Sequence, residues 1–294
     1  MPVTASPPRG RTHRAGGRAL FLDQAGAGGP AVVVLPGAGL VGLDYLNVHT
    51  AAAEFTTSVL YDRAGTGWSD PVALPRTAAE VATELRDLLR AAEVAGPYVL
   101  AGHSLGASYA RRFTQLFPAD VAGLLLLDPG HEDLFAHLPA EAAELNDRMK
   151  EAAAEMPDLT EDQLRTARGQ YAELFAEWPP DVREPLVEHH LTTWRTVIDE
   201  TANEDDVYAE LRAGGELPDV PLIVLTAMGR NPYWSQFGSE ELIQAAQRGI
   251  RDLHASIAAA SSRGEHRVLD DAAHQFLHIQ RKDAVLRAIR DLTR

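Results

Sequence analysis

The sequence predicts an α/β fold in which a doubly wound, mostly parallel sheet is interrupted by an all-helical cap. Short apolar, β-branched runs alternate with amphipathic helical segments, and this alternation is typical of parallel sheets covered on both faces. The alternation stops over residues 131–217, where only helical patterns rich in Glu and Ala occur. We therefore expect a core over 18–130 and 218–294, a cap over 131–217 and a flexible tail over 1–17.

The expected strands are short, and those over 31–35 and 121–127 in particular are apolar throughout, as strands buried on both faces are. They cover 19–23, 31–35, 57–61, 98–101, 121–127, 220–226 and 265–269. The expected helices of the core repeat their apolar residues three and four apart, and Thr77 and Glu80 form a capping box at the start of the first. They cover 77–92, 107–117, 242–261 and 284–292, and the cap helices cover 140–156, 161–175 and 181–201.

Composition excludes several classes of function. The net charge of −15 would repel a polyanion, so nucleic acid is not an expected partner. The chain has no cysteine, which excludes disulfides and thiolate metal sites. Its apolar runs fall far short of the roughly 18–20 residues of a membrane span, and residues 1–17 lack the hydrophobic region of a secretory signal. We expect no membrane partner and a cytoplasmic location.

Residues 102–106 read Gly-His-Ser-Leu-Gly, a G-x-S-x-G motif between an apolar run and a helical pattern. At such a strand-to-helix corner the serine is forced into a strained conformation, and the residues two positions away on either side must be very small. The hydroxyl then lies at a helix N-terminus, which favours developing negative charge. Because strand and helix flank the motif, we interpret Ser104 as a nucleophile and not as a chance match.

A serine nucleophile needs a base, and in this type of fold the base is a histidine that follows the last strand. Of the eleven histidines, His274 has this position. His278, one helical turn later, is expected to pack or to cap, and His103 is expected to support the tight turn. The side chains of His189 and His190 would point about 100° apart on a helix, so a shared metal ion is not expected.

The acid that orients the histidine has several candidates. The expected strand 220–226 runs into residues 227–233, which contain no Asp or Glu, whereas the strand after the serine's helix ends in Asp128. We interpret Asp128 as the acid, while its alternative role is to cap the turn before Pro129. The remaining candidates are Asp270, Asp271, Glu132 and Asp133.

An oxyanion hole needs two backbone N–H donors, and Leu105 would supply the first. The glycine-rich loop 36–40 would supply the second, with Ala38 favoured and Gly39 or Leu40 as alternatives. Gly37 and Leu40 of this loop are also expected to contact the substrate. The loop lacks the patterns that bind nucleotide phosphates, so the sequence predicts no cofactor, and no metal is expected.

Five motifs carry a family resemblance that extends from residue 18 to 294. They are LPGAG at 35–39, YDRAGTGWSD at 61–70, AGHSLGA at 101–107, LLLLDPGHED at 124–133 and DDAAHQF at 270–276. With them the chain resembles the α/β-hydrolase superfamily. It departs from the usual pattern in having Pro36-Gly37 where His-Gly is common, and in lacking the acid after the penultimate strand. Asp128 occupies the recognised alternative position.

Asp128 follows Ser104 by 24 residues, and this spacing and the helical cap resemble lactone hydrolases such as the zearalenone-degrading enzymes. The resemblance implies a serine hydrolase of carboxylic esters or lactones, with a moderately bulky, apolar small molecule as substrate. Trp194 and Tyr233 are the aromatic residues expected to contact it. Alternatives on the same triad are a peptidase, a carbon–carbon hydrolase or a cofactor-free haloperoxidase; a binding protein without catalysis is a further alternative.

Overall fold

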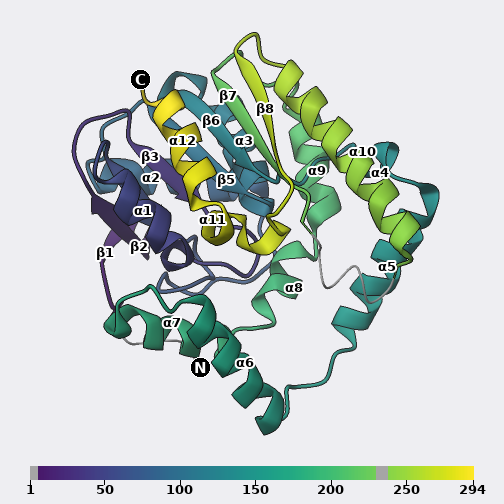
Figure 1. Ribbon diagram of the computed structural model, residues 1–294. Helices are drawn as coiled ribbons and strands as arrows, with labels where there is room; N and C mark the ends of the chain where they lie inside the picture. Colours follow the sequence, from purple (N-terminus) through teal and green to yellow (C-terminus); the bar gives the residue numbers. More distant parts are fainter. Residues whose placement is uncertain (1–5, 230–237) are drawn as a thin grey trace.

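An eight-stranded sheet runs through the centre of the computed structural model, which describes residues 6–229 and 238–294 (Figure 1). The strand order is β1-β2-β4-β3-β5-β6-β7-β8, with antiparallel pairing from β1 to β4 and parallel pairing from β4 to β8. The strands are β1 (Arg11–Ala15), β2 (Arg18–Ala25), β3 (Val32–Leu35), β4 (Ser58–Tyr61), β5 (Tyr98–His103), β6 (Val121–Leu127), β7 (Leu222–Ala227) and β8 (Gly264–Leu269). The predicted fold class is confirmed.

The segment 1–17, expected to be a flexible tail, contains a strand. Residues Arg11–Ala15 pair with β2 through a two-residue turn at Gly16 and Gly17, both with positive φ. The burial pattern of β1 is mostly exposed, because it is an edge strand. Polar side chains on an edge strand give no apolar run, which is why the sequence pattern did not reveal it.

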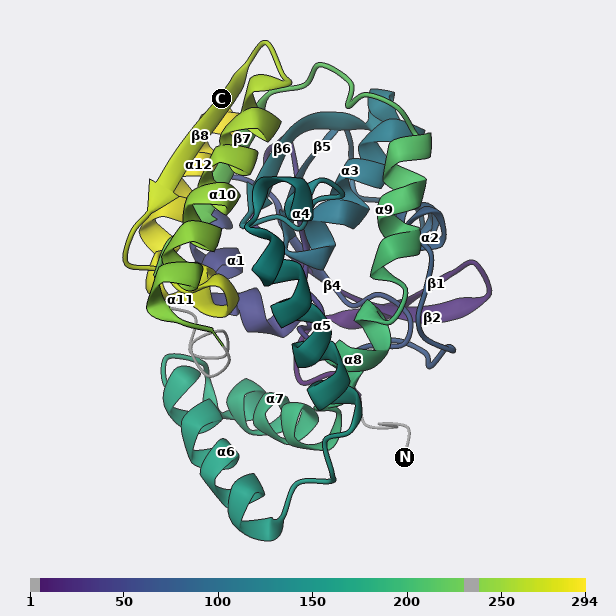
Figure 2. The same ribbon diagram turned by 90° about the vertical axis from the view of Figure 1, so that its right-hand side faces the viewer.

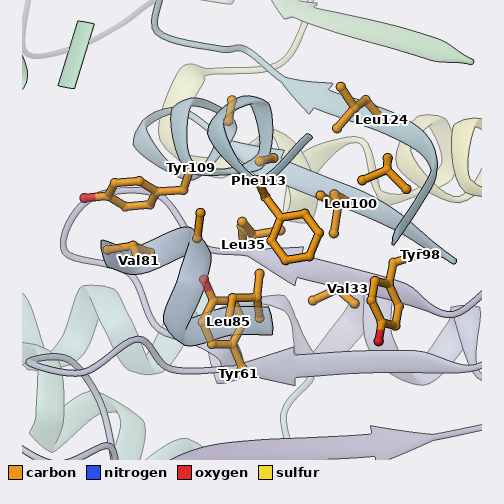
Figure 3. Packing of buried hydrophobic residues seen from close by; sticks show 14 of the residues in the cluster. Val33, Leu35, Tyr61, Val81, Leu85, Tyr98, Leu100, Tyr109, Phe113 and Leu124 are labelled. Carbon is orange, nitrogen blue, oxygen red and sulfur yellow. The ribbon is translucent and has the colours of Figure 1, made fainter. Parts of the chain in front are cut away.

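Helices cover both faces of the sheet. The helices α1 (Leu46–Ala52), α11 (Leu277–Gln280) and α12 (Lys282–Leu292) lie on one face, and α2 (Ala78–Ala91), α3 (Leu105–Leu116) and α10 (Glu240–Ala259) lie on the other (Figure 1). In β3, Val33 and Leu35 pack in the core toward α2 and α3 (Figure 3), whereas Val32 and Val34 pack toward α1 and α12. Both faces of the strand are therefore apolar, as predicted. The capping box of Thr77 and Glu80 is also confirmed.

Six helices follow one another between β6 and β7. They are α4 (Leu134–His137), α5 (Ala140–Ala154), α6 (Glu161–Leu174), α7 (Pro180–Thr192), α8 (Thr196–Thr201) and α9 (Glu204–Ala213). Figures 1 and 2 show α6 and α7 beyond the carboxyl ends of the parallel strands, and α9 packs on α3. Within the described residues, no helix is long and apolar enough to cross a membrane.

The single helix expected over 181–201 is two helices, α7 and α8. At the break, the hydroxyls of Thr192 and Thr193 both donate to the backbone carbonyl of His189. The Thr193 N–H donates to the same carbonyl, and the backbone of Thr193 leaves the helical conformation with φ −118° and ψ 21°. The helix α9 was not expected. The cap is anchored to the core by Trp178, whose indole N–H donates to the Leu43 carbonyl at 2.8 Å.

Candidate active site

Ser104 lies at the corner between β5 and α3, with φ 51° and ψ −119°. A side chain at Gly102 would place its Cβ 2.6 Å from the Cα of Ala107, and one at Gly106 would collide with the Leu35 carbonyl. The corner therefore admits only glycine at both positions, as the motif predicts. A non-glycine residue held at positive φ costs on the order of 1–3 kcal/mol, and the packed strand and helix supply that energy.

His274 connects Ser104 to Asp128. The Ser104 hydroxyl is 3.0 Å from His274 Nε2, and the Nδ1–H of the same ring donates to Asp128 Oδ2 at 2.6 Å. His274 begins the short 3-10 helix η4 (His274–Phe276), which follows β8 in the chain. The structure thus brings together three predicted site residues from three separate strand ends.

The electrostatics of this chain of hydrogen bonds favour a charged Asp128. Burial alone would raise the pKa of Asp128, but the hydrogen bond and charge of His274 hold it below the ordinary value. Burial alone would likewise lower the pKa of His274, and the hydrogen bond to Asp128 and its charge raise it instead. A histidine held in this way is neutral above its raised pKa and gains a proton more readily than an isolated one.

Asp128 is held by the neighbouring strand β7. Its Oδ1 accepts from the Ala227 N–H at 2.9 Å, and His254 Nδ1 lies 3.7 Å from the same oxygen. In this type of fold the carboxylate that orients the histidine commonly follows the strand equivalent to β7. Here the end of β7 supplies a backbone N–H donor to Asp128 instead of a carboxylate. Asp128 itself has φ 45°, a left-handed conformation that Asp tolerates better than most residues.

The other acid candidates lie elsewhere. Glu132 makes two hydrogen bonds of 2.7 Å to Arg111. Asp271 pairs with Arg281 at 2.6 Å, and Asp270 is exposed. The fourth candidate, Asp133, pairs with Arg212.

His103, which precedes Ser104, forms hydrogen bonds to two other segments of the site. Its Nε2–H donates to the backbone carbonyl of His274 at 2.8 Å, which leaves Nδ1 to accept from the Tyr45 hydroxyl at 2.6 Å. The Tyr45 oxygen in turn accepts from the Gly37 N–H at 3.2 Å. Burial and the nearby His274 keep the pKa of His103 well below the ordinary value, so the ring stays neutral. The ring of His103 thus links His274 to the loop after β3.

The backbone amides of that loop are nearly all engaged. The N–H of Gly37 donates to Tyr45, that of Gly39 to Glu200 at 2.8 Å and that of Leu40 to the Gly37 carbonyl at 3.2 Å. Within the described part of the chain, the Ala38 N–H has no such partner. This accounting favours Ala38, over its two neighbours, as the donor left for a ligand.

The loop is fixed by a buried ion pair that sequence reasoning did not identify. Arg63, which follows β4 and is 1% exposed, donates to the carbonyls of Pro36 and Gly37 at 2.8 Å each. It also makes two bonds of 2.5 and 2.8 Å to Glu200, which is 2% exposed on α8. Burial opposes the charge on Arg63, but Glu200 more than offsets this and raises its pKa.

This ion pair joins the cap to the loop. Because Glu200 also accepts from the Gly39 N–H, one cap carboxylate contacts both the loop and the arginine that holds it. Val197 of α8 lies so close to Gly39 that a Cβ there would approach it to 2.8 Å. Arg63 belongs to the YDRAG motif, so its position in the sequence was visible, but its partner 137 residues away was not.

Two cavities meet at Ser104 and His274. The larger, of about 300 Å³, lies between the loop and helices α6 to α8, and the smaller, of about 210 Å³, lies on the Asp128 side near α9 and α10. Trp194, Gly37 and Leu40 line the larger cavity. Tyr233 lies outside the described residues. Among the described residues, no three His, Asp or Glu side chains converge as metal ligands would.

A sheet of this strand order, with a strained serine at the corner after β5, defines a class of α/β enzymes. A model described as the alpha/beta hydrolase family matches residues 32–288. The chain belongs to this family. The matched residues include strands β3 to β8 and the loop after β3. They also include Ser104 and His274.

Curated relatives match only part of the chain. The uncharacterized protein YqjL of Bacillus subtilis is 40% identical over 83 residues, which are 28% of this chain and 33% of YqjL. In another curated relative the matched segment is 14% of its length. The chain thus spans a third or less of these two relatives.

Solved structures match nearly the whole chain. Est816, described as an N-acyl homoserine lactone degrading enzyme, has a TM-score of 0.60 at 20% identity, covering 95% of this chain and 99% of that one. An enol-lactonase from Burkholderia xenovorans LB400 has a TM-score of 0.61 at 15% identity, covering 96% and 98%. At these identities the likeness shows the fold alone.

Proposed function

We propose that the protein is a serine hydrolase that cleaves carboxylic esters or lactones. The observation that carries the proposal is the hydrogen-bonded chain from Ser104 through His274 to Asp128 at the junction of two cavities. A buried carboxylate that fixes the histidine, and a histidine that takes the serine proton, are the parts that nucleophilic acyl transfer requires.

In this mechanism the Ser104 oxygen attacks the carbonyl carbon while its proton passes to His274 Nε2. The tetrahedral oxyanion is stabilised by the N–H groups of Leu105 and Ala38, the first at the N-terminus of α3. The carbon–oxygen bond to the leaving group then breaks, and His274 returns the proton to the leaving oxygen. Water, deprotonated by the same histidine, hydrolyses the acyl-enzyme and restores Ser104.

The substrate is proposed to be a moderately bulky, mostly apolar molecule. Much of the surface of the larger cavity is apolar, from aromatic and aliphatic side chains, and polar residues are interspersed among them, a mixture that is common in small-molecule sites. Trp194, on the segment between α7 and α8, is one of these, as are Leu174, Phe175 and Ile279. Two of the structurally similar enzymes act on lactones by their names, which supports including lactones among the substrates. Macrolactones of the zearalenone type are lactones of the proposed size and polarity.

A panel of substrates tests the proposal. We expect the purified protein to hydrolyse p-nitrophenyl esters of graded acyl length and aryl lactones, and to cleave p-nitroanilide amides much more slowly. Stoichiometric labelling of Ser104 by a fluorophosphonate should accompany this activity. Preferential hydrolysis of amides would favour a peptidase, and turnover only of carbon–carbon substrates would favour that alternative chemistry.

Changing Glu200 to Gln should lower kcat by about 10- to 100-fold, because Glu200 and Arg63 hold the loop that carries Ala38, the proposed oxyanion donor. Loss of one such donor lowers kcat by this order or more. The change leaves the Arg63 charge buried without its partner, which also costs about 3–5 kcal/mol of stability. Ester kinetics and thermal unfolding at a temperature where the variant is folded measure both effects. The control is Asp199→Asn, the exposed neighbour on α8. A folded Glu200→Gln variant with the wild-type kcat would contradict the role of this ion pair.

A further inference from the structure

The larger cavity contains, beside its apolar lining, a polar cluster that the proposed reaction does not use. We propose that this cluster, formed by His190 with Asp44 and by His278, is a subsite for a neutral hydroxyl group on the acyl part of the substrate. The inference rests on the proposed function and narrows it to esters or lactones of hydroxyl-bearing, otherwise apolar acids.

Asp44 and His190 form a buried pair across the boundary between core and cap. Asp44, in the short 3-10 helix η1 (Gly42–Tyr45), is 1% exposed, and His190 on α7 is 5% exposed. One carboxylate oxygen of Asp44 accepts from the Val41 N–H at 2.7 Å, and the other accepts from His190 Nε2–H at 2.8 Å. This bond assigns the Nε2 proton, so Nδ1 of His190 is the ring nitrogen left for a ligand. Both residues line the cavity.

His278 adds a second unused polar group to the same cavity wall. It is 1% exposed, and its ring nitrogens are buried without a hydrogen bond of ordinary geometry to the described residues. Burial lowers its pKa to about 4, against the opposing charge and backbone carbonyl of Asp44, so the ring is neutral at physiological pH. A neutral imidazole carries one donor and one acceptor, and a buried polar atom without a well-formed hydrogen bond is unfavourable.

The chemistry of the cluster selects a hydroxyl over other groups. A hydroxyl both donates and accepts, so it can donate to the acceptor nitrogen of His190 and still accept a hydrogen bond from a second group. A carboxylate would meet the Asp44 charge inside a protein of net charge −15. A methyl group of similar size would leave the imidazole nitrogens unpaired.

The aromatic side chains around the cluster favour a substrate in which this hydroxyl is attached to a flat, apolar group. The ring of Tyr171 stacks on His190 with centroids 4.9 Å apart and planes 11° apart, and Phe175 follows at 5.9 Å and 19°. The loop 36–40, which contains Ala38, the proposed oxyanion donor, lines this cavity together with Ser104. We therefore assign the acyl group of the substrate to this cavity and the leaving group to the smaller one near α9 and α10.

The neighbouring histidine provides a matched control. His189 is on the same helix and is also buried, but its ring stacks on Trp68 with centroids 5.5 Å apart, and it is absent from the lining of the cavity. His189→Phe and His190→Phe thus make the same chemical change one residue apart. Only the second removes a nitrogen from the cavity.

The test compares p-nitrophenyl esters of 4-hydroxyphenylalkanoic acids with their 4-methyl and 4-carboxy isosteres, over several alkyl lengths. At the alkyl length that gives the fastest hydrolysis, we expect kcat/KM to be about 10- to 100-fold higher for the 4-hydroxy ester than for the 4-methyl ester. The methyl group would leave buried polar groups of the site without hydrogen bonds. The 4-carboxy ester should have the lowest kcat/KM. His190→Phe should abolish the hydroxyl-to-methyl ratio, and His189→Phe should retain it. His190→Gln, whose amide oxygen still accepts, should keep part of it.

The outcomes separate this inference from the proposed function. Hydrolysis of p-nitrophenyl acetate without any hydroxyl preference would overturn the subsite and leave the serine hydrolase intact. A preference that persists in His190→Phe, or that occurs only when the hydroxyl is on the alcohol side of the ester, would also overturn it. Failure to cleave any ester would overturn the proposed function, and the subsite with it. Because the wild-type series is sufficient, a variant that does not fold leaves the inference falsifiable.

Discussion

Ser104→Ala is expected to reduce kcat for p-nitrophenyl esters by about 10⁴- to 10⁶-fold, since losing the nucleophile removes the covalent pathway and leaves only binding and oxyanion stabilisation. The fold should persist, because alanine occupies less space at the same corner and Gly102 and Gly106 are unchanged. Steady-state kinetics with active-site titration measures the loss.

The control for this change is Ser108→Ala, one turn further along α3. Ser108 is 1% exposed, and its hydroxyl has no hydrogen-bond partner within the described residues, so its removal should leave kcat near the wild-type value. Fluorophosphonate should label the Ser108→Ala variant and fail to label Ser104→Ala. Substantial turnover by highly purified Ser104→Ala would exclude the serine mechanism.

Asp128→Asn is expected to lower kcat by about 10²- to 10⁴-fold, because an amide no longer fixes the tautomer or the charge of His274. The substitution is well matched: asparagine tolerates the φ of 45° and can still accept from the Ala227 N–H. Asp271→Asn, which breaks only an exposed pair with Arg281, is the control and should be nearly as active as the wild type. The reverse result would assign the acid to the loop after β8.

The pH profile provides an independent readout of the same pair. The base must be neutral, so kcat/KM should rise with pH through the pKa of His274, which Asp128 raises above the ordinary 6.5. Removing the negative charge in Asp128→Asn removes the factor that raises this pKa. The acidic limb of the profile should therefore move to lower pH in the variant, and a shift in the opposite direction would contradict the assignment.

The parts of the fold that the sequence predicted are those specified by local pattern. Continuous apolar runs predicted the bounds of β3 and β6 to within one residue at each end. The prediction works because a strand buried on both faces is apolar at nearly every position. The capping box placed the start of α2. The edge strand β1 and the break between α7 and α8 were missed, since an edge needs no apolar pattern and residues 193–195 contain no glycine or proline to mark the end of a helix.

The sequence by itself determined the serine corner and the histidine that follows β8, because a G-x-S-x-G turn and a final-strand histidine are defined by spacing along the chain. It favoured Asp128 as the acid because residues 227–233 contain no carboxylate, but it left Glu132, Asp133, Asp270 and Asp271 as alternatives. In the structure, Asp128 is the one of these that hydrogen-bonds to His274.

Only the tertiary structure brought together Arg63 with Glu200 and Asp44 with His190. Each pair joins the core to a cap helix more than 130 residues later in the chain. Charged residues are common at the surface, so a sequence gives no sign of which of them are buried together. Their pairing depends on how α7 and α8 pack over the core, and that packing decides both the position of the loop after β3 and the polar groups of the larger cavity.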